Sequence, residues 1–200
     1  MAATRLDRLV AEVRACRLCT DLPLGPRPML RASTTARICI IGQAPGTKVH
    51  ETGIPWNDRS GDRLRAWLEL DRDQFYDVKR LAIVPMGFCY PGRDAHGGDL
   101  PPRRACAPAW HGRLMALMPR LELVLLVGSY AQAYYLGRDR KATMTETVAA
   151  WRDHAFKDQM PRYFPLPHPS WRNTAWLKRN PWFTKKLLPD LRAQVHGLVG

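Results

Sequence analysis

Residues 121–127 (LELVLLV) form the apolar run that most constrains the fold of this chain. A run of this length with almost no polar alternation is typical of a strand that is buried on both faces. Residues 37–42 and 81–84 are shorter runs of the same kind, and a final strand is expected near 163–166. Segments with helical periodicity separate the runs, which predicts parallel strands with helices on both faces. We therefore expect an α/β fold: a three-layer α/β/α sandwich around a mostly parallel four-stranded central sheet.

The segments between the strands carry helix signals. Apolar residues recur at helical spacing over 4–15, and Ser60 is a candidate N-cap for a helix that begins at Gly61. Residues 85–102 are rich in Gly and Pro, and this connection is long enough to predict a functional role. Further helices are expected over 103–118, in a short segment ending at 136, near 144–152 and over 181–197.

Length and charge limit the class of protein. The 200 residues fit one domain, residues 1–200. Lys and Arg number 31 against 18 Asp and Glu, which gives a formal net charge of +13. This excess favours a polyanionic partner such as DNA, although basic proteins near the ribosome share it. The sequence has neither a bilayer-spanning apolar stretch nor a signal-peptide core, so we expect a cytoplasmic monomer, associated with the bacterial nucleoid and without membrane contact.

The chain has five cysteines. Cys39 lies inside an expected strand, where a small buried hydrophobe fits. In a reducing compartment the other four, Cys16, Cys19, Cys89 and Cys106, indicate a metal site rather than disulfides. Zinc and an iron–sulfur cluster both accept four thiolates, and spacing alone does not choose between them. Four unrelated buried thiols are the alternative.

Two polar motifs follow expected strands, residues 42–46 (GQAPG) and residues 168–173 (HPSWRN). Open α/β sheets build their sites at such strand ends. In combination with the cysteine pattern, the motifs resemble the uracil-DNA glycosylase superfamily, closest to its iron–sulfur branches (families four and five). The resemblance implies a 4Fe–4S cluster held by the four cysteines named above. It also implies a DNA repair enzyme that flips uracil or another deaminated base out of DNA, hydrolyses its N-glycosidic bond and leaves an abasic site.

The resemblance assigns roles to the first motif and the segment after it. Gly42, Gln43 and Ala44 would contact the flipped base through their backbone. In many relatives an acidic residue of this motif positions the attacking water, whereas Gln43 can orient a water but cannot take its proton. Residues 58–62 (DRSGD) resemble a family-five motif whose first residue is the catalytic carboxylate, here Asp58. A carboxylate that only meets the dipole of the following helix is the alternative for Asp58.

The aromatic ring and the second motif complete the predicted site. Trp56 occupies the position where relatives stack a ring on the base, with a core tryptophan as the alternative. His168 would donate to the pyrimidine oxygen as the base departs. Ser170 would grip the flanking phosphate, and Trp171 or Arg172 would fill the space vacated in the minor groove.

Three features depart from the family pattern. Relatives carry a base-reading asparagine after the second strand, but residues 84–88 are VPMGF, which leaves Asn57 as a candidate substitute. A crosslinking branch carries a nucleophilic histidine in a basic loop, whereas glycines and acids surround His96 and favour a solvated side chain. These departures, with the missing acid at Gln43, keep open a damaged- or abasic-DNA binding protein with weak or no turnover. A plain iron–sulfur redox protein is a third possibility.

Overall fold

The computed structural model describes residues 3–155, 158 and 160–199. Its centre is a four-stranded sheet in the order β2-β1-β3-β4. Every pairing is parallel, so the sheet is entirely rather than mostly parallel. The strands are β1 (Ile38–Ile41), β2 (Leu81–Ile83), β3 (Leu123–Val127) and β4 (Arg162–Leu166).

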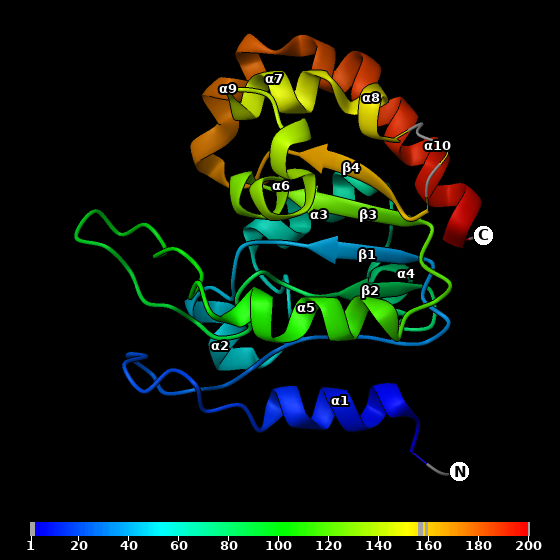
Figure 1. Ribbon diagram of the computed structural model, residues 1–200. Helices are drawn as coiled ribbons and strands as arrows, with labels where there is room; N and C mark the ends of the chain where they lie inside the picture. Colours follow the sequence, from blue (N-terminus) through cyan, green and yellow to red (C-terminus); the bar gives the residue numbers. More distant parts are fainter. Residues whose placement is uncertain (1–2, 156–157, 159, 200) are drawn as a thin grey trace.

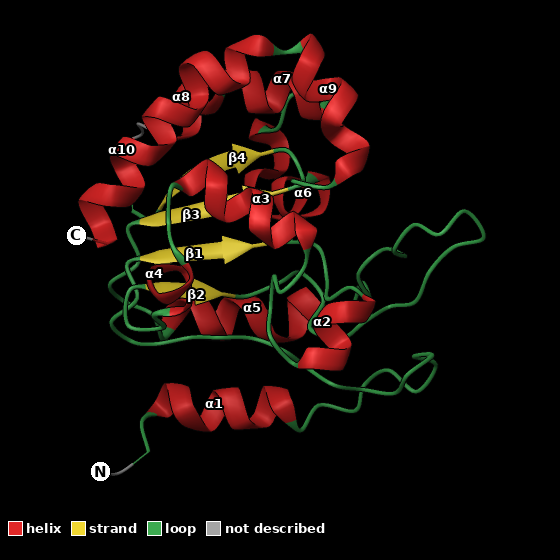
Figure 2. Ribbon diagram, turned by 180° about the vertical axis from the view of Figure 1, so that it is seen from behind, coloured by secondary structure: helices red, strands yellow, loops and turns green. Residues whose placement is uncertain are grey.

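Ten α-helices surround the described sheet. Helices α1, α5 and α6 lie on one face, and α3, α4, α7, α8 and α10 lie on the other (Figures 1 and 2). The predicted three-layer α/β/α architecture is therefore confirmed. The helices are α1 (Arg5–Arg14), α2 (Thr47–Thr52), α3 (Arg59–Leu68), α4 (Arg72–Tyr76), α5 (Cys106–Ala116), α6 (Ser129–Leu136), α7 (Met144–Ala149), α8 (Trp151–Ala155), α9 (Thr174–Arg179) and α10 (Leu188–Val199).

The sheet separates two hydrophobic cores. Side chains alternate along a strand, so Ile38 and Ile40 of β1 enter one core while Cys39 and Ile41 enter the other. Cys39 is fully buried, as expected of a small core residue, and burial raises the pKa of its thiol to about 12. Because both faces of β1 are covered, its run of apolar residues shows no polar alternation.

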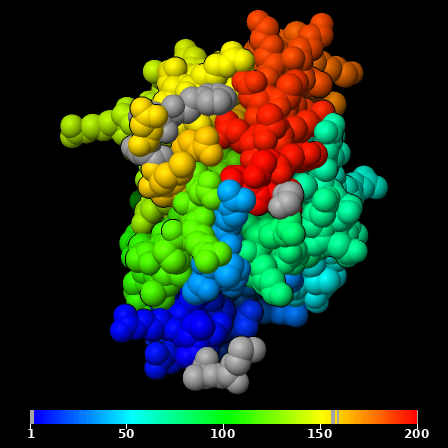
Figure 3. All heavy atoms as spheres, turned by 90° about the vertical axis from the view of Figure 1, so that its right-hand side faces the viewer, coloured from blue at the N-terminus to red at the C-terminus, as the bar shows by residue number. Residues whose placement is uncertain are grey.

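The C-terminal helix α10 closes the side of the sheet that carries α3 (Figure 3). Arg192 donates from Nε to the carbonyl oxygen of Trp67 at 3.0 Å, and Nε2 of His196 lies 3.0 Å from the carbonyl oxygen of Leu68. These contacts anchor the C-terminal end of α3.

Several helix boundaries differ from those expected. Asp58, not Ser60, is the N-cap of α3, because its Oδ1 accepts the Gly61 N–H at 2.8 Å. The helix expected over 144–152 is two short helices, α7 and α8. The C-terminal helix begins with a π-helical segment, Phe183–Leu187. Helices α2 and α4 were not expected, although Asp71 and Gln74 form a capping box at the start of α4.

The topology determines where a site can form. The chain leaves β1 toward β2 on one side and pairs with β3 on the other, so the strand order reverses at β1. Open α/β sheets bind ligands in the crevice at the carboxyl ends of strands around such a point. No helix in the described part of the chain is both long enough and apolar enough to cross a membrane.

Candidate active site and cysteine pocket

A cavity of about 680 Å³ opens at the carboxyl ends of the strands. Most of its wall comes from four segments: residues 42–46 after β1, residues 55–60 around the start of α3, the loop 93–99, and residues 168–173 after β4. The predicted site residues that line this cavity are Gly42, Gln43, Ala44, Trp56, Asp58, His168, Ser170, Trp171 and Arg172.

The backbone holds the Trp56 ring against the first motif. Trp56 has a left-handed backbone with φ of 58°, and its carbonyl oxygen accepts Nη1 of Arg65 at 3.2 Å. Glycine is required at position 61, because a Cβ there would lie 1.7 Å from that oxygen. A Cβ at Gly42 would lie 2.7 Å from the indole ring, so the ring covers the turn directly. Trp56 is a partly buried wall of the cavity that also packs on the core.

His168 lies beside this ring. The two ring centroids are 5.7 Å apart with an interplanar angle of 31°. The side-chain amide of Asn173 donates to the His168 carbonyl oxygen at 2.7 Å, which fixes the turn after β4. Burial lowers the pKa of His168 below its ordinary value, and the nearby Asp58 carboxylate opposes this shift. The imidazole is therefore neutral at neutral pH and has one N–H to donate.

Asp58 combines the two roles that the sequence presented as alternatives. Its Oδ1 caps α3, and the same side chain lines the cavity close enough to His168 to influence its pKa. A carboxylate has two oxygens and about four acceptor positions, so the cap leaves acceptor capacity facing the cavity.

Gln43 lines the cavity, whereas Asn57 does not. The Gln43 Nε2 donates to the Leu100 carbonyl oxygen at 3.0 Å and so ties the first motif to the long loop. The Asn57 Oδ1 accepts from Arg72 at 3.3 Å. The structure therefore does not bring Asn57 to the place of the missing asparagine, where Pro85 lines the cavity instead.

The loop 93–99 lies in the connection for which the sequence predicts a functional role, but none of its residues is among the predicted site residues. It contributes Arg93, Asp94, His96 and Asp99 to the wall. Nη2 of Arg172 donates to the His96 carbonyl oxygen at 3.3 Å, which joins the loop to the second motif. His96 is exposed, as expected, yet it belongs to the cavity lining. The only sequence signal for this wall is the length of the connection between β2 and α5.

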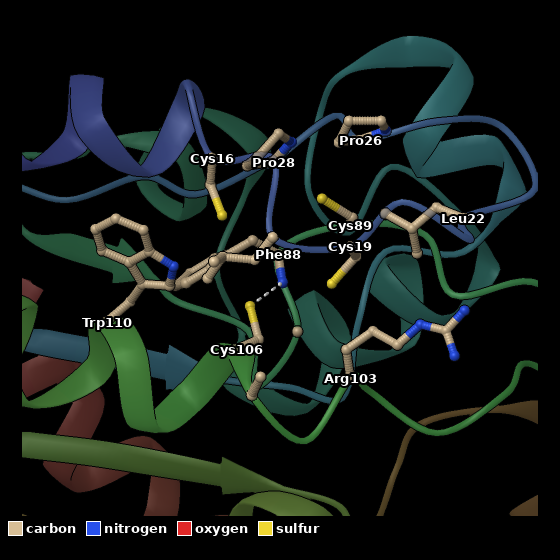
Figure 4. A pocket seen from close by; sticks show the side chains of 13 residues that line it. Cys16, Cys19, Leu22, Pro26, Pro28, Phe88, Cys89, Arg103, Cys106 and Trp110 are labelled. Atoms are coloured by element: carbon tan, nitrogen blue, oxygen red, sulfur yellow. Dashed lines mark hydrogen bonds between the residues drawn. The ribbon is translucent and has the colours of Figure 1, made fainter.

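The four predicted metal ligands line a second pocket. Cys16 and Cys19 come from the segment after α1, Cys89 from the long connection, and Cys106 from the first turn of α5. Their sulfur atoms surround one space, with the Phe88 backbone among them (Figure 4). All four are free thiols. Within the described residues, no group of three or more His, Cys, Asp or Glu side chains has a geometry that could hold a metal ion.

The chemistry of this pocket fits a thiolate-bound cofactor. The Phe88 N–H donates to Cys106 Sγ at 3.4 Å, an interaction that favours a thiolate. Burial raises the pKa of Cys106 to about 12 and also raises the pKa of Cys89. Thiols in such surroundings ionise when a cationic centre binds them. The donor set suits zinc and iron–sulfur clusters alike.

An open parallel sheet whose carboxyl edge gathers an imidazole, a carboxylate and an aromatic ring has the ligand-binding architecture of α/β proteins. The model of the uracil DNA glycosylase superfamily matches residues 31–192, and the chain belongs to this superfamily. Membership implies a glycosylase that acts on DNA. The match includes both motifs, Cys89 and Cys106, and it begins after Cys16 and Cys19.

Proposed function

We propose that this protein is a monofunctional DNA glycosylase that removes uracil or another deaminated base and leaves an abasic site. The observation that carries the proposal is the grouping of Trp56, Asp58 and His168 around one cavity in a member of this superfamily. The proposal treats residues 1–200 as one domain that acts as a monomer.

Trp56, residues 42–44 and His168 form the part of the cavity that binds the base and stabilises it as it leaves. The flipped base stacks on the Trp56 ring, a contact worth roughly 1–3 kcal/mol. Backbone groups of residues 42–44 cradle its edge. Neutral His168 donates its N–H to a base oxygen as the departing base becomes an anion, and a buried donor is most effective there.

The sugar and phosphate half of the cavity holds the DNA. The Asp58 carboxylate stabilises the positive charge that develops on the sugar as the N-glycosidic bond breaks. Ser170 contacts a flanking phosphate. Trp171 is 74% exposed, and the Arg172 guanidinium carbon lies over its ring, 5.5 Å from the centroid. This pair fills the space in the duplex that the flipped nucleotide vacates.

We further assign a 4Fe–4S cluster to Cys16, Cys19, Cys89 and Cys106, which places the protein with the iron–sulfur branches, families four and five. The shared pocket, the free thiols and the N–H donor to Cys106 suit zinc as well as a cluster. Membership of a superfamily with iron–sulfur branches is what favours the cluster over zinc. When bound, such a cluster would crosslink three chain segments and supply structural stability. Visible absorption and iron and sulfide analysis of the purified protein test the assignment, and bound zinc would contradict it.

An excision assay tests the function. Oligonucleotides with a single uracil, hypoxanthine, xanthine or abasic site are incubated with the protein, as single and double strands, and alkali then cleaves at abasic products. We expect base release from at least one deaminated substrate and loss of release in His168→Ala. Binding of the abasic oligonucleotide gives the affinity of the protein for its product.

A binding protein for damaged or abasic DNA is the second candidate. Pro85 lines the cavity where relatives place an amide, and Gln43 stands where many relatives have an acid, so both specificity and turnover could be reduced. Tight binding of the same oligonucleotides without release of any base would favour this candidate and overturn the enzyme. A redox protein, the third possibility, would bind the DNA weakly.

A further inference from the structure

The first motif lacks an acid, but the loop beside it supplies one. Asp99 belongs to the loop 93–99 and lines the same cavity as Asp58 and His168. Its Oδ2 lies 3.4 Å from the position of a Cβ on Gly46, the last residue of the first motif. Its side chain is 45% exposed, so water reaches the carboxylate from the cavity.

Hydrogen bonds within the loop 93–99 fix the position of Asp99. The Asp94 Oδ1 accepts the backbone N–H groups of His96 and Gly98, both at 2.8 Å. Asp94 N also donates to the Gly98 carbonyl oxygen at 2.8 Å, and a β-bridge pairs Arg93 with Asp99. The loop therefore forms a closed turn whose last residue is Asp99.

Two further hydrogen bonds fasten this turn across the cavity. One runs from Gln43 Nε2 to the carbonyl oxygen of Leu100, next to Asp99, at 3.0 Å. The other runs from Arg172 to the carbonyl oxygen of His96 at 3.3 Å. The first motif and the second motif thus each hold one side of the loop that carries Asp99.

The two cavity carboxylates differ in their surroundings. Asp58 Oδ1 is engaged by the Gly61 N–H at the start of α3. Asp99 faces Arg93 at 3.8 Å and Asp94 within its own loop, Asp58 from α3, and Arg172 from the second motif. Burial raises the pKa of Asp99, the two aspartates add to this, and the two arginines oppose it. Asp99 is therefore a stronger base than an ordinary aspartate.

We propose that Asp99 is a catalytic residue that holds the attacking water and accepts its proton, while Asp58 faces the sugar cation. This inference rests on the proposed glycosylase function. Water oxygen forms the new bond to C1′ as the N-glycosidic bond breaks, and the electron pair of that bond leaves with the base. One water proton goes to the Asp99 carboxylate and reaches the base anion through solvent, so water is consumed and a free base and an abasic sugar result.

Single-turnover excision by Asp99→Asn tests the role. We expect the rate to fall by at least about 100-fold, while affinity for the abasic oligonucleotide is unchanged or tighter, since a negative charge facing DNA is removed. Asp73→Asn on α4 is the matched control, because it removes one exposed carboxylate outside the cavity and leaves the rate unchanged.

Two readouts separate proton transfer from loop structure. Added formate should restore part of the rate to Asp99→Ala, because it returns a carboxylate to the space. The wild-type rate should fall as pH falls through the pKa of Asp99, and Asp99→Asn should lose that limb of the profile. Asp99→Asn could instead be slow while keeping the acid limb of its pH profile, with Asp99→Ala gaining no rate from formate. That combination would make Asp99 a structural residue and overturn the inference.

The failures of the two proposals are distinguishable. An active wild type with an Asp99→Asn rate within threefold of it overturns this inference alone. A wild type that releases no base from any substrate overturns the proposed function and, with it, this inference.

Discussion

The cavity and the cysteine pocket are organised in different ways, although both use the connection between β2 and α5. In the cavity, backbone conformation and hydrogen bonds from separate elements fix the polar side chains, as the Asn173 contact to His168 illustrates. In the cysteine pocket, the thiols extend from irregular segments and from one helix end. The protein therefore preorganises the polar side chains of the cavity through its own hydrogen bonds, whereas in the cysteine pocket a backbone group, the Phe88 N–H, donates to a sulfur.

The two regions are neighbours rather than independent units. Gly87 lies between them: a Cβ there would be 2.9 Å from Cβ of Pro102 and 3.6 Å from Cβ of Ala44, which lines the cavity. Two residues further along the chain, Cys89 faces the cysteine pocket. A change in one region can therefore reach the other.

Asp58→Asn should have the largest effect. Asparagine caps a helix as well as aspartate does, so α3 and the unfolding temperature should be preserved while the charge facing the cavity is lost. We expect excision to slow by about 100-fold or more. Asp71→Asn, at the N-cap of α4, is the matched control and should change neither rate nor unfolding temperature. A matching loss of stability and rate in Asp58→Asn would indicate that Asp58 is only a cap.

His111 joins the two regions and should make stability depend on pH. It lies on α5, its Nε2 donates to the Pro85 carbonyl oxygen at 3.0 Å, and its Nδ1 accepts the Tyr135 hydroxyl at 2.7 Å. Burial lowers the pKa of His111 to about 4. Between about pH 6.5 and pH 4 the unfolded chain therefore binds the proton that the folded protein excludes.

The free energy of unfolding should accordingly decrease as pH falls through this window, by up to about 3 kcal/mol. Denaturant unfolding of the wild type and of His111→Gln at both ends of the window measures the difference. The variant cannot titrate at this position, so it should lose that share of the pH dependence. Equal slopes in the two proteins would contradict the assignment.

Cys106→Ser should separate the cysteine pocket from the cavity. We expect loss of iron and of visible absorption, and a decrease in stability of about 2 kcal/mol through the lost crosslink between distant segments. Cys39→Ala should retain both the iron and the absorption, since Cys39 lies in the core beneath the sheet. If the cavity is self-organised, folded Cys106→Ser still excises the base. Complete loss of excision in a folded variant would show that the cofactor organises both regions.

Gln43→Leu should have the smallest effect. It removes the hydrogen bond to Leu100, which is worth about 1 kcal/mol, and leaves the turn of residues 42–46 in place. We expect excision to slow by roughly fivefold and backbone amides of residues 93–99 to exchange faster with solvent. Unchanged exchange in this loop would indicate that the Arg172 contact alone holds it.

The sequence predicted the strands because their burial on both faces leaves continuous apolar runs, as in β3. It also indicated which motifs meet, since His168 and the first motif both follow parallel strands at the same sheet edge. It predicted Ser60 as the helix cap, and this was wrong, because Asp58 caps equally well and stands only two residues earlier.

Asp99 was beyond the reach of local patterns. An aspartate after two glycines is typical of a solvated turn, and only tertiary hydrogen bonds from Gln43 and Arg172 bring its loop to the cavity. Asn57 is the converse case, since the missing asparagine after the second strand made it a candidate substitute that the structure does not bring to the cavity. Arg72, from a helix that the sequence did not predict, accounts for the direction of its side chain.

The strand order has a consequence for how this chain reaches its native state. Ile38 pairs with Leu81 and Leu123, and Leu123 pairs with Arg162, so no strand finds its neighbour nearby in the chain. Each pairing must first close a long loop, and such topologies fold slowly compared with helical bundles. During synthesis the apolar β1 emerges well before β3 exists to cover its second edge. Until β3 pairs with it, this edge of β1 is open to non-native strand pairing.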